Sequence, residues 1–164
     1  MANKYIALNA GKLTNTEATV VSAGAGDAGE IVALDGDGKI DVSVLPVGVG
    51  PDVKVLITSE NLSAGDYVNI YDNATVATAR LADKSNNRPA HGFVKAVTTS
   101  PAVATVYFEG PNANLSGLTV GARQYLDTVG GTTETPQSTG LHQLLGIAVA
   151  ATEINTDIED CIVL

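Results

Sequence analysis

The residues whose chemistry could support catalysis are few in this sequence, and they are not grouped. The chain has two histidines, His91 and His142, and one cysteine, Cys161. A hydrolytic centre needs a base beside a nucleophile and an orienting acid, and the spacing nominates neither a serine nor Cys161 as that nucleophile. Two histidines without cysteine or acidic neighbours also make a poor metal site. We therefore expect a protein that is not an enzyme and that uses neither a cofactor nor a metal.

A glycine pattern typical of dinucleotide sites occurs near the N-terminus. Residues 24–29 read GAGDAG and match G-x-G-x-x-G. Such a site needs a long helix whose N-terminus faces the pyrophosphate. Here only EIVAL follows, at residues 30–34, before DGDG interrupts the chain at residues 35–38. The crossover unit of a dinucleotide fold does not fit, so we expect no nucleotide at this position.

The next segment, DGDGKID at residues 35–41, resembles part of a calcium loop. If Gly38 is aligned with the glycine of that loop, Ala33 and Val44 fall at positions that must supply carboxylate oxygens. Neither residue can, so we interpret the segment as a β-turn between two short strands. The sequence leaves open weak cation binding by Asp35, Asp37 and Asp41.

The C-terminal segment combines acidic residues with a short apolar run. Cys161 opens the run CIVL and is predicted to be a packed thiol; as the only cysteine it has no partner for an intrachain disulfide. The acidic residues before it are interpreted as a solvated loop rather than as a glycosidase-like carboxylate pair. They are Glu153, Asp157, Glu159 and Asp160.

The overall charge excludes some classes of partner. The chain has 9 basic and 18 acidic residues, a formal net charge of −9. Phosphate backbones are bound through Lys and Arg, so nucleic acid is not expected as a partner. No apolar run approaches the roughly 18 residues of a membrane span, and Lys4 is not followed by the long apolar core of a signal peptide. We expect no membrane partner and a protein that is made and folded in a cytoplasm.

The elements that must position these residues are predicted to be strands. Residues 53–58, 67–71 and 104–109 show alternating side-chain character, and turn signals separate them. Val and Thr are abundant and aromatic residues are few, as in sheets that pack small side chains. The sequence therefore predicts an all-β fold, with a small β-barrel or sandwich domain at residues 52–164.

A weak internal repeat favours the barrel. Residues 61–68 are similar to residues 118–126, and residues 91–97 to residues 145–150. Two pseudo-repeats of about four strands each, closing on one another, would remove most free sheet edges.

Residues 1–51 differ in character from the rest of the chain. They contain eight of the 17 glycines and only one of the seven aromatic residues, Tyr5. Short apolar segments separated by glycines cannot bury one another efficiently, and glycine loses much backbone entropy on ordering. We therefore interpret residues 1–51 as an extended arm that lies along the surface of another protein.

Several segments resemble virion structural proteins of tailed bacteriophages. Residues 31–46 read IVALDGDGKIDVSVLP and residues 1–13 read MANKYIALNAGKL. The segments AGDYV, AHGFV, TVYFEG and LSGLTVGARQYL follow in order, at residues 64–68, 90–94, 105–110 and 115–126. The resemblance covers most of the chain and is strongest to phage head decoration, or cement, proteins.

This resemblance implies a protein of the outer capsid surface of the virion. It would stabilise the shell by bridging subunits of the major capsid protein, and it would form a homotrimer. The arm would supply the capsid contacts through its apolar residues. These candidate binding residues are Tyr5, Ile6, Leu8, Ile31, Val32, Leu34, Ile40, Val42, Val44, Leu45 and Pro46.

The alternative is a structural protein of a head fibre, tail fibre or baseplate, with a host-surface or anchoring role. Glycan-binding sites usually present aromatic faces, and outside residues 1–51 the chain has four Tyr, two Phe and no Trp. This composition argues against a dedicated lectin but leaves an anchoring role open.

Overall fold

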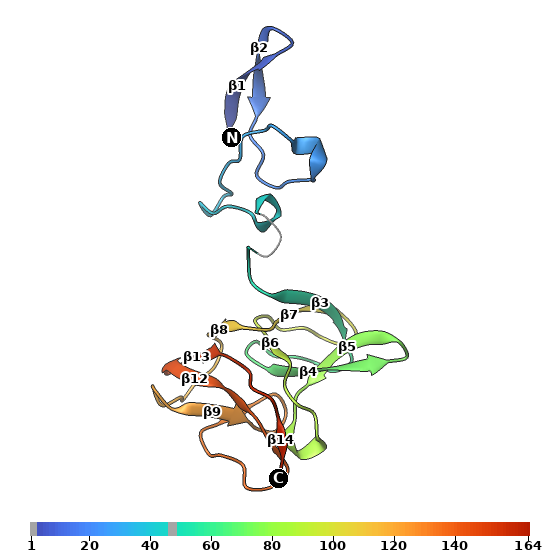
Figure 1. Cartoon of the computed structure of the whole chain (residues 1–164), viewed down its shortest axis with the longest axis vertical. Coiled ribbons are helices and arrows are strands. Elements are labelled where there is room, and N and C mark those ends of the chain that lie inside the picture. The colour runs from blue at the N-terminus through green and yellow to red at the C-terminus, as the bar shows by residue number, and fades with distance from the viewer. Residues whose placement is uncertain (1–2, 46–48) are drawn as a thin grey trace. The chain divides into compact units, whose positions relative to one another are not determined.

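The structure is a computed structural model, which describes residues 3–45 and 49–164. The described residues form strands, turns and three short 3₁₀ helices, with no α-helix among them. The predicted all-β fold is therefore confirmed. The chain divides into two compact units, Met1–Gly50 and Pro51–Leu164, called unit 1 and unit 2 below (Figure 1).

Unit 1 contains a β-hairpin that the sequence analysis did not predict. Strands β1 (Lys4–Asn9) and β2 (Lys12–Glu17) pair antiparallel in continuous register. Between them Ala10 and Gly11 both have positive φ, 47° and 77°, which is the requirement of a tight two-residue hairpin turn. Two 3₁₀ helices follow, η1 (Ala25–Asp27) and η2 (Val42–Val44). Regular structure in this unit is therefore local and short.

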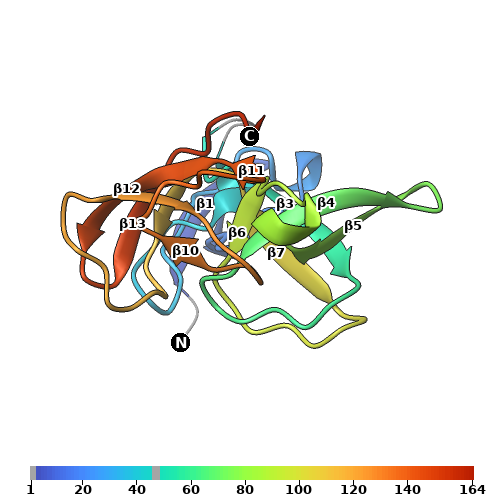
Figure 2. The same ribbon diagram turned by 90° about the horizontal axis from the view of Figure 1, so that it is seen from below.

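The first half of unit 2 closes into a barrel of five strands. The order around the barrel is β3-β5-β4-β6-β7, and β7 pairs with β3 to complete it. All neighbours are antiparallel except β3 and β5, which run parallel over two residue pairs. The hairpin β4–β5 projects from the barrel (Figure 2). The strands are β3 (Val53–Thr58), β4 (Tyr67–Asn73), β5 (Val76–Leu81), β6 (Gly92–Val94) and β7 (Val103–Tyr107).

The second half of unit 2 is an open antiparallel sheet with the order β10-β9-β12-β13-β8. Strands β11 and β14 form a separate two-stranded sheet, and the 3₁₀ helix η3 (Lys84–Asn86) lies between β5 and β6 in the chain. The strands are β8 (Gly110–Asn112), β9 (Arg123–Leu126), β10 (Thr132–Thr133), β11 (Leu141–His142), β12 (Leu144–Ala150), β13 (Glu153–Thr156) and β14 (Ile162–Val163).

Two hydrophobic cores hold unit 2 together. The first fills the barrel and consists of Leu56, Leu62, Val68, Ala79, Val94, Ala104 and Val106. The second joins β4 and β6 of the barrel to β9, β12 and β13 of the open sheet, and consists of Tyr67, Ala82, Ala90, Phe93, Leu126, Leu141, Leu145 and Ile154. Strand β4 is therefore buried on both faces, with Val68 in the first core and Tyr67 in the second.

The predicted internal repeat has a counterpart in strand pairing. Val68 of β4 lies opposite Gly92 of β6, and Gln124 of β9, 56 residues after Val68, lies opposite Gly146 of β12. The arrangement of the halves differs from the expectation that they close on one another. The parallel contact of β3 with β5 closes the first half by itself, whereas the second half is an open sheet whose edge strands, β10 and β8, do not pair with each other.

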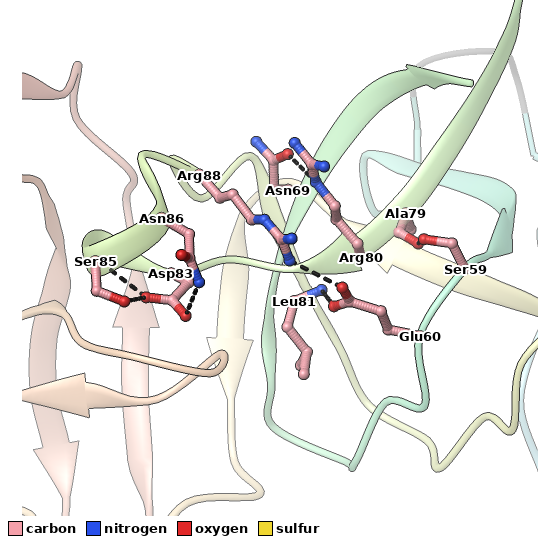
Figure 3. Close-up of polar contacts among 10 residues, drawn as sticks. All are labelled: Ser59, Glu60, Asn69, Ala79, Arg80, Leu81, Asp83, Ser85, Asn86 and Arg88. Carbon is pink, nitrogen blue, oxygen red and sulfur yellow. Dashed lines mark hydrogen bonds and ion pairs between the residues drawn. The ribbon is translucent and has the colours of Figure 1, made fainter. Parts of the chain in front are cut away.

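A cluster of polar side chains fixes the loops at one end of the barrel (Figure 3). Arg88 Nη1 lies 2.8 Å from Glu60 Oε1, and Glu60 Oε2 accepts a hydrogen bond from the N–H of Leu81 at 2.9 Å. Asp83 Oδ1 accepts from the N–H and hydroxyl of Ser85 at 2.8 and 2.6 Å. Burial tends to raise the pKa of the Asp83 carboxyl, but the hydrogen bonds outweigh it and hold this pKa below its usual value. These groups satisfy one another, so we assign the cluster a structural role.

The prediction that Cys161 is a packed thiol is wrong. Its side chain is exposed, because the residue precedes the two-residue strand β14, whose only strand partner is β11. The apolar residues after it are also exposed, so the run CIVL does not enter either core.

Candidate attachment surface

One face of the β1–β2 hairpin exposes apolar side chains. Ile6, Leu8 and Leu13 are 65%, 70% and 76% exposed. Leu8 and Leu13 lie directly opposite each other in the ladder, so their side chains occupy the same face. Tyr5, in contrast, points to the other face and is partly buried. The hairpin therefore places two of the three predicted residues of this segment on a solvent-facing apolar surface, and adds Leu13, which the sequence analysis missed.

A second group of predicted residues surrounds Ala33, the only buried residue among those described in unit 1. The N–H of Thr19 donates to the carbonyl of Ile31, and the N–H of Ala33 donates to the carbonyl of Thr19, both at 2.9 Å. These bonds hold the backbone in a short parallel bridge. Ile31, Val32 and Leu34 remain exposed on it.

The third group lies around η2. Asp41 caps this helix: its Oδ1 accepts from the N–H of Ser43 at 2.8 Å, and the Ser43 contacts lower the pKa of the Asp41 carboxyl. The Ser43 hydroxyl oxygen in turn accepts from the N–H of Ser22 at 2.8 Å. Within this frame Ile40 and Val42 are exposed, whereas Val44 and Leu45 are half-buried. The remaining predicted residue, Pro46, lies outside the described residues.

These three groups share one physical property: their apolar side chains have almost nothing of their own unit to pack against. A two-stranded hairpin is marginally stable in water unless its apolar face is covered, and exposed apolar groups of this density mark interaction surfaces. The described part of unit 1 can therefore supply apolar contacts to a partner, and it has no catalytic arrangement. We call Ile6, Leu8 and Leu13 the hairpin face.

The other motifs of unit 1 are engaged in local backbone hydrogen bonds. The N–H of Gly38 donates to the carbonyl of Asp35 at 3.1 Å, so the predicted β-turn is found, but the described residues on either side of it form no strands. Asp35 Oδ1 accepts from the N–H groups of Asp37 and Lys39 at 2.9 and 2.8 Å, so this carboxylate is occupied. Residues 25–27 of the glycine pattern form only the three-residue helix η1. Among the residues that the structure describes, no three His, Cys, Asp or Glu side chains are grouped as a metal site.

The two histidines of unit 2 lie in different settings. His91 Nδ1 accepts the N–H of Ile70 at 2.9 Å, at the edge of β4, and burial lowers the pKa of its imidazole. The ring of His142 lies 5.0 Å from the ring of Tyr125.

No helix in the described ranges, 3–45 and 49–164, is long and apolar enough to cross a membrane.

The comparisons with known proteins found similarity among solved structures only. No family model matches the sequence, and no curated protein matches it. Among solved structures, the fold is similar to that of the head fibre gp8.5 N base of bacteriophage phi29, with a TM-score of 0.49 and 11% sequence identity. The match covers 68% of this chain and 92% of that chain.

Proposed function

We propose that this protein is a structural protein of a tailed-phage virion, bound to the outer surface of the head through unit 1. The observation that carries the proposal is the hairpin face together with the exposed residues around Ala33 and η2. These are the same segments, residues 1–13 and 31–46, whose sequence resembles that of phage virion proteins.

The mode of action that we favour is that of capsid cement. Three short apolar groups separated by turns form several weak contacts rather than one strong one, and linked weak contacts bind far more tightly together than singly. If the groups contact different subunits of the major capsid protein, they tie these subunits together against the pressure of the packaged genome. We propose that the protein acts as a homotrimer, and that neither nucleic acid nor a membrane is a partner.

A second candidate is the base of a head or tail fibre. Unit 2 has an uncovered apolar face of its own, formed by outward-facing valine and isoleucine side chains of β3 and β7. A further fibre component could attach there while unit 1 holds the head. The two candidates differ in one measurable property: loss of a cement protein lowers the temperature at which shells rupture, whereas loss of a fibre base removes fibres and leaves that temperature unchanged.

The test uses the full chain and shells that lack this protein. We expect Leu8→Asp combined with Leu13→Asp to lower the affinity for shells, measured by co-sedimentation, by about 100-fold or more. Each leucine that is buried in the contact contributes about 1.5–3 kcal/mol, and about 1.4 kcal/mol corresponds to a tenfold change in affinity. Val149→Asp is the matched control, since Val149 is an exposed strand residue of unit 2. Unchanged binding of the double variant, or equal loss in the control, would refute attachment through the hairpin face.

A further inference from the structure

The outer surface of strands β3 and β7 is apolar along its whole length. Val53, Val55 and Ile57 point outward from β3, and the cross-strand register places Tyr107, Thr105 and Val103 opposite them in that order. Val55 is 58% exposed and Val103 is 65% exposed, while Tyr107 is half-buried. We call Val53, Val55, Ile57, Val103 and Thr105 the β3–β7 face.

This face reverses the pattern of a barrel strand that meets water. An antiparallel sheet with one face in the core normally turns polar side chains to solvent. In β3 the inward residues are Leu56 and Thr58, which are buried, and the hydroxyl of Thr58 has no hydrogen-bond partner. Three of the four aliphatic residues of the strand, Val53, Val55 and Ile57, therefore lie on the outside. These outward residues do not contribute to the core of the barrel, so we expect another surface to cover them.

The open sheet of unit 2 does not provide that surface. It packs against the opposite part of the barrel, where Tyr67 and Phe93 join the second core. Tyr107 marks the border, with its ring 5.7 Å from that of Phe93. Both views show β3 apart from β9, β12 and β13 (Figures 1 and 2).

A hollow beside β7 extends the face. It has a volume of about 280 Å³ and is lined by residues 95–98 and 103–105, together with Tyr107. Lys95 borders it, with its Nζ 4.3 Å from the centre of the Tyr107 ring, and Val97 is largely exposed. The face thus combines projecting aliphatic side chains with an adjacent cavity that can receive such side chains.

The charge of the face indicates which partner fits. Residues 53–58, 95–98 and 103–107 contain no Asp or Glu, and their only charged residues are Lys54 and Lys95. The whole chain carries −9, so two copies repel each other wherever their acidic surfaces meet. Lys54 alternates with the valines of β3 and lies on the other side of the strand, so Lys95 is the charged residue that borders the face. A second acidic copy can approach this acid-free apolar face with less electrostatic repulsion than it meets at acidic surface.

We propose that the β3–β7 face is the surface through which this protein binds a second copy of itself. The inference deepens the proposed function, on which it rests for the oligomeric state, by assigning the contact between copies to named residues. Attachment to the shell is left to unit 1, so each unit has one binding surface. Because the apolar contact works against a net repulsion between copies, added salt strengthens the association by screening that repulsion.

The experiment measures the mass of the full chain in solution by sedimentation equilibrium, without shells. We expect a wild-type mass of several chains, and a larger associated fraction at 0.5 M than at 0.05 M NaCl. Val55→Asp with Val103→Asp should give the mass of one chain. Val55→Thr with Val103→Thr, which keeps the β-branched shape, should weaken association at least tenfold, and it covers the case in which the aspartates disturb folding. The matched controls are Val76→Asp and Val149→Asp, which alter exposed strand valines outside the face.

Three outcomes would overturn the inference: a monomeric wild-type chain in solution and on shells, an oligomer that both double variants leave intact, or equal dissociation by the controls. Variants of the face that stay oligomeric but lose shell binding would show that it contacts a capsid subunit instead, and would also overturn it. The sedimentation assay and the shell-binding test address different claims. Failure of the Leu8 and Leu13 test would disprove attachment through unit 1 and leave self-association through the β3–β7 face undecided. Failure of the sedimentation assay would disprove self-association through that face and leave attachment through unit 1 undecided.

Discussion

The two units of this chain use apolar residues in opposite ways. Unit 2 buries them in two cores that share strand β4, one inside the barrel and one between the barrel and the open sheet. The described part of unit 1 buries a single alanine and leaves ten large aliphatic side chains, among them the three of the hairpin face, in contact with water. Burial of apolar area is the main source of folding stability. The difference predicts that unit 2 is stable alone, whereas unit 1, under the function proposed above, gains its stabilising contacts from a partner.

The largest predicted difference is in the free energy of unfolding, between substitution of a core residue of unit 2 and substitution of an exposed residue of unit 1. Phe93 is completely buried and contacts Tyr67 and Tyr107. Phe93→Ala should lower the free energy of unfolding by about 3–5 kcal/mol, whereas Leu8→Ala should change it by less than about 0.5 kcal/mol. Urea denaturation of the full chain, followed by circular dichroism, measures both. A cost of 2 kcal/mol or more for Leu8→Ala would mean that unit 1 has a core of its own.

A second prediction concerns the glycines of the internal repeat. A Cβ on Gly92 would lie 2.6 Å from the carbonyl oxygen of Tyr107, and one on Gly146 would clash with the carbonyl oxygen of Asn155. Alanine at either position should cost about 1–3 kcal/mol through overpacking. Gly36 of unit 1 has open space around it and no positive φ, so Gly36→Ala should be neutral or stabilise by up to about 1 kcal/mol. Thermal melts of the three variants would contradict the comparison if Gly36→Ala were the most harmful.

The smallest effect is a dependence of stability on pH that arises in unit 2. Burial lowers the pKa of His91 in the folded protein, and its Nδ1 accepts the N–H of Ile70 only while that nitrogen is unprotonated. The unfolded chain takes up this proton near the ordinary pKa of about 6.5, so the stability is fully present above that pH and is lost as the pH falls toward the folded pKa. The melting temperature should therefore fall from pH 7.5 to 5.5. The His91→Ala variant should have a lower melting temperature at pH 7.5, and its melting temperature should fall less between pH 7.5 and 5.5. If the variant showed the same fall as the wild type, other groups would cause the pH dependence.

The sequence predicts the parts of this fold that follow from local periodicity. Alternation located β3, β4 and β7. The match of residues 61–68 and 91–97 with later segments indicated an internal repeat, and the structure pairs the repeated strands within each half, as β4–β6 and β9–β12. Alternation alone does not tell which face of a strand is buried, and in β3 the exposed face is the more aliphatic one. This depends on where the open sheet packs against the barrel, which is a property of tertiary structure.

The sequence predicted the region of the candidate attachment surface and some of its residues, but not the hairpin that presents them. Composition identified unit 1 as a region that cannot bury its own apolar side chains, which the exposure of Ile6 and Leu8 bears out. The hairpin was missed because the turn uses Ala10 before Gly11, and alanine is a weak signal for a residue with positive φ. Recognition of that turn would have paired Leu13 with Leu8. The exposure of Cys161 was missed because the sequence of an apolar run does not tell whether the run lies in a core or at an exposed sheet edge.

The measurement that tests the central claim most directly is amide hydrogen exchange of the full chain, free and bound to shells. The account predicts fast exchange in residues 4–17 and 31–45 of the free protein, strong protection of these segments on the shell, and unchanged protection of β4 and β6 in unit 2. Protection gained only in unit 2, with residues 4–17 and 31–45 exchanging equally fast in both states, would contradict attachment through unit 1.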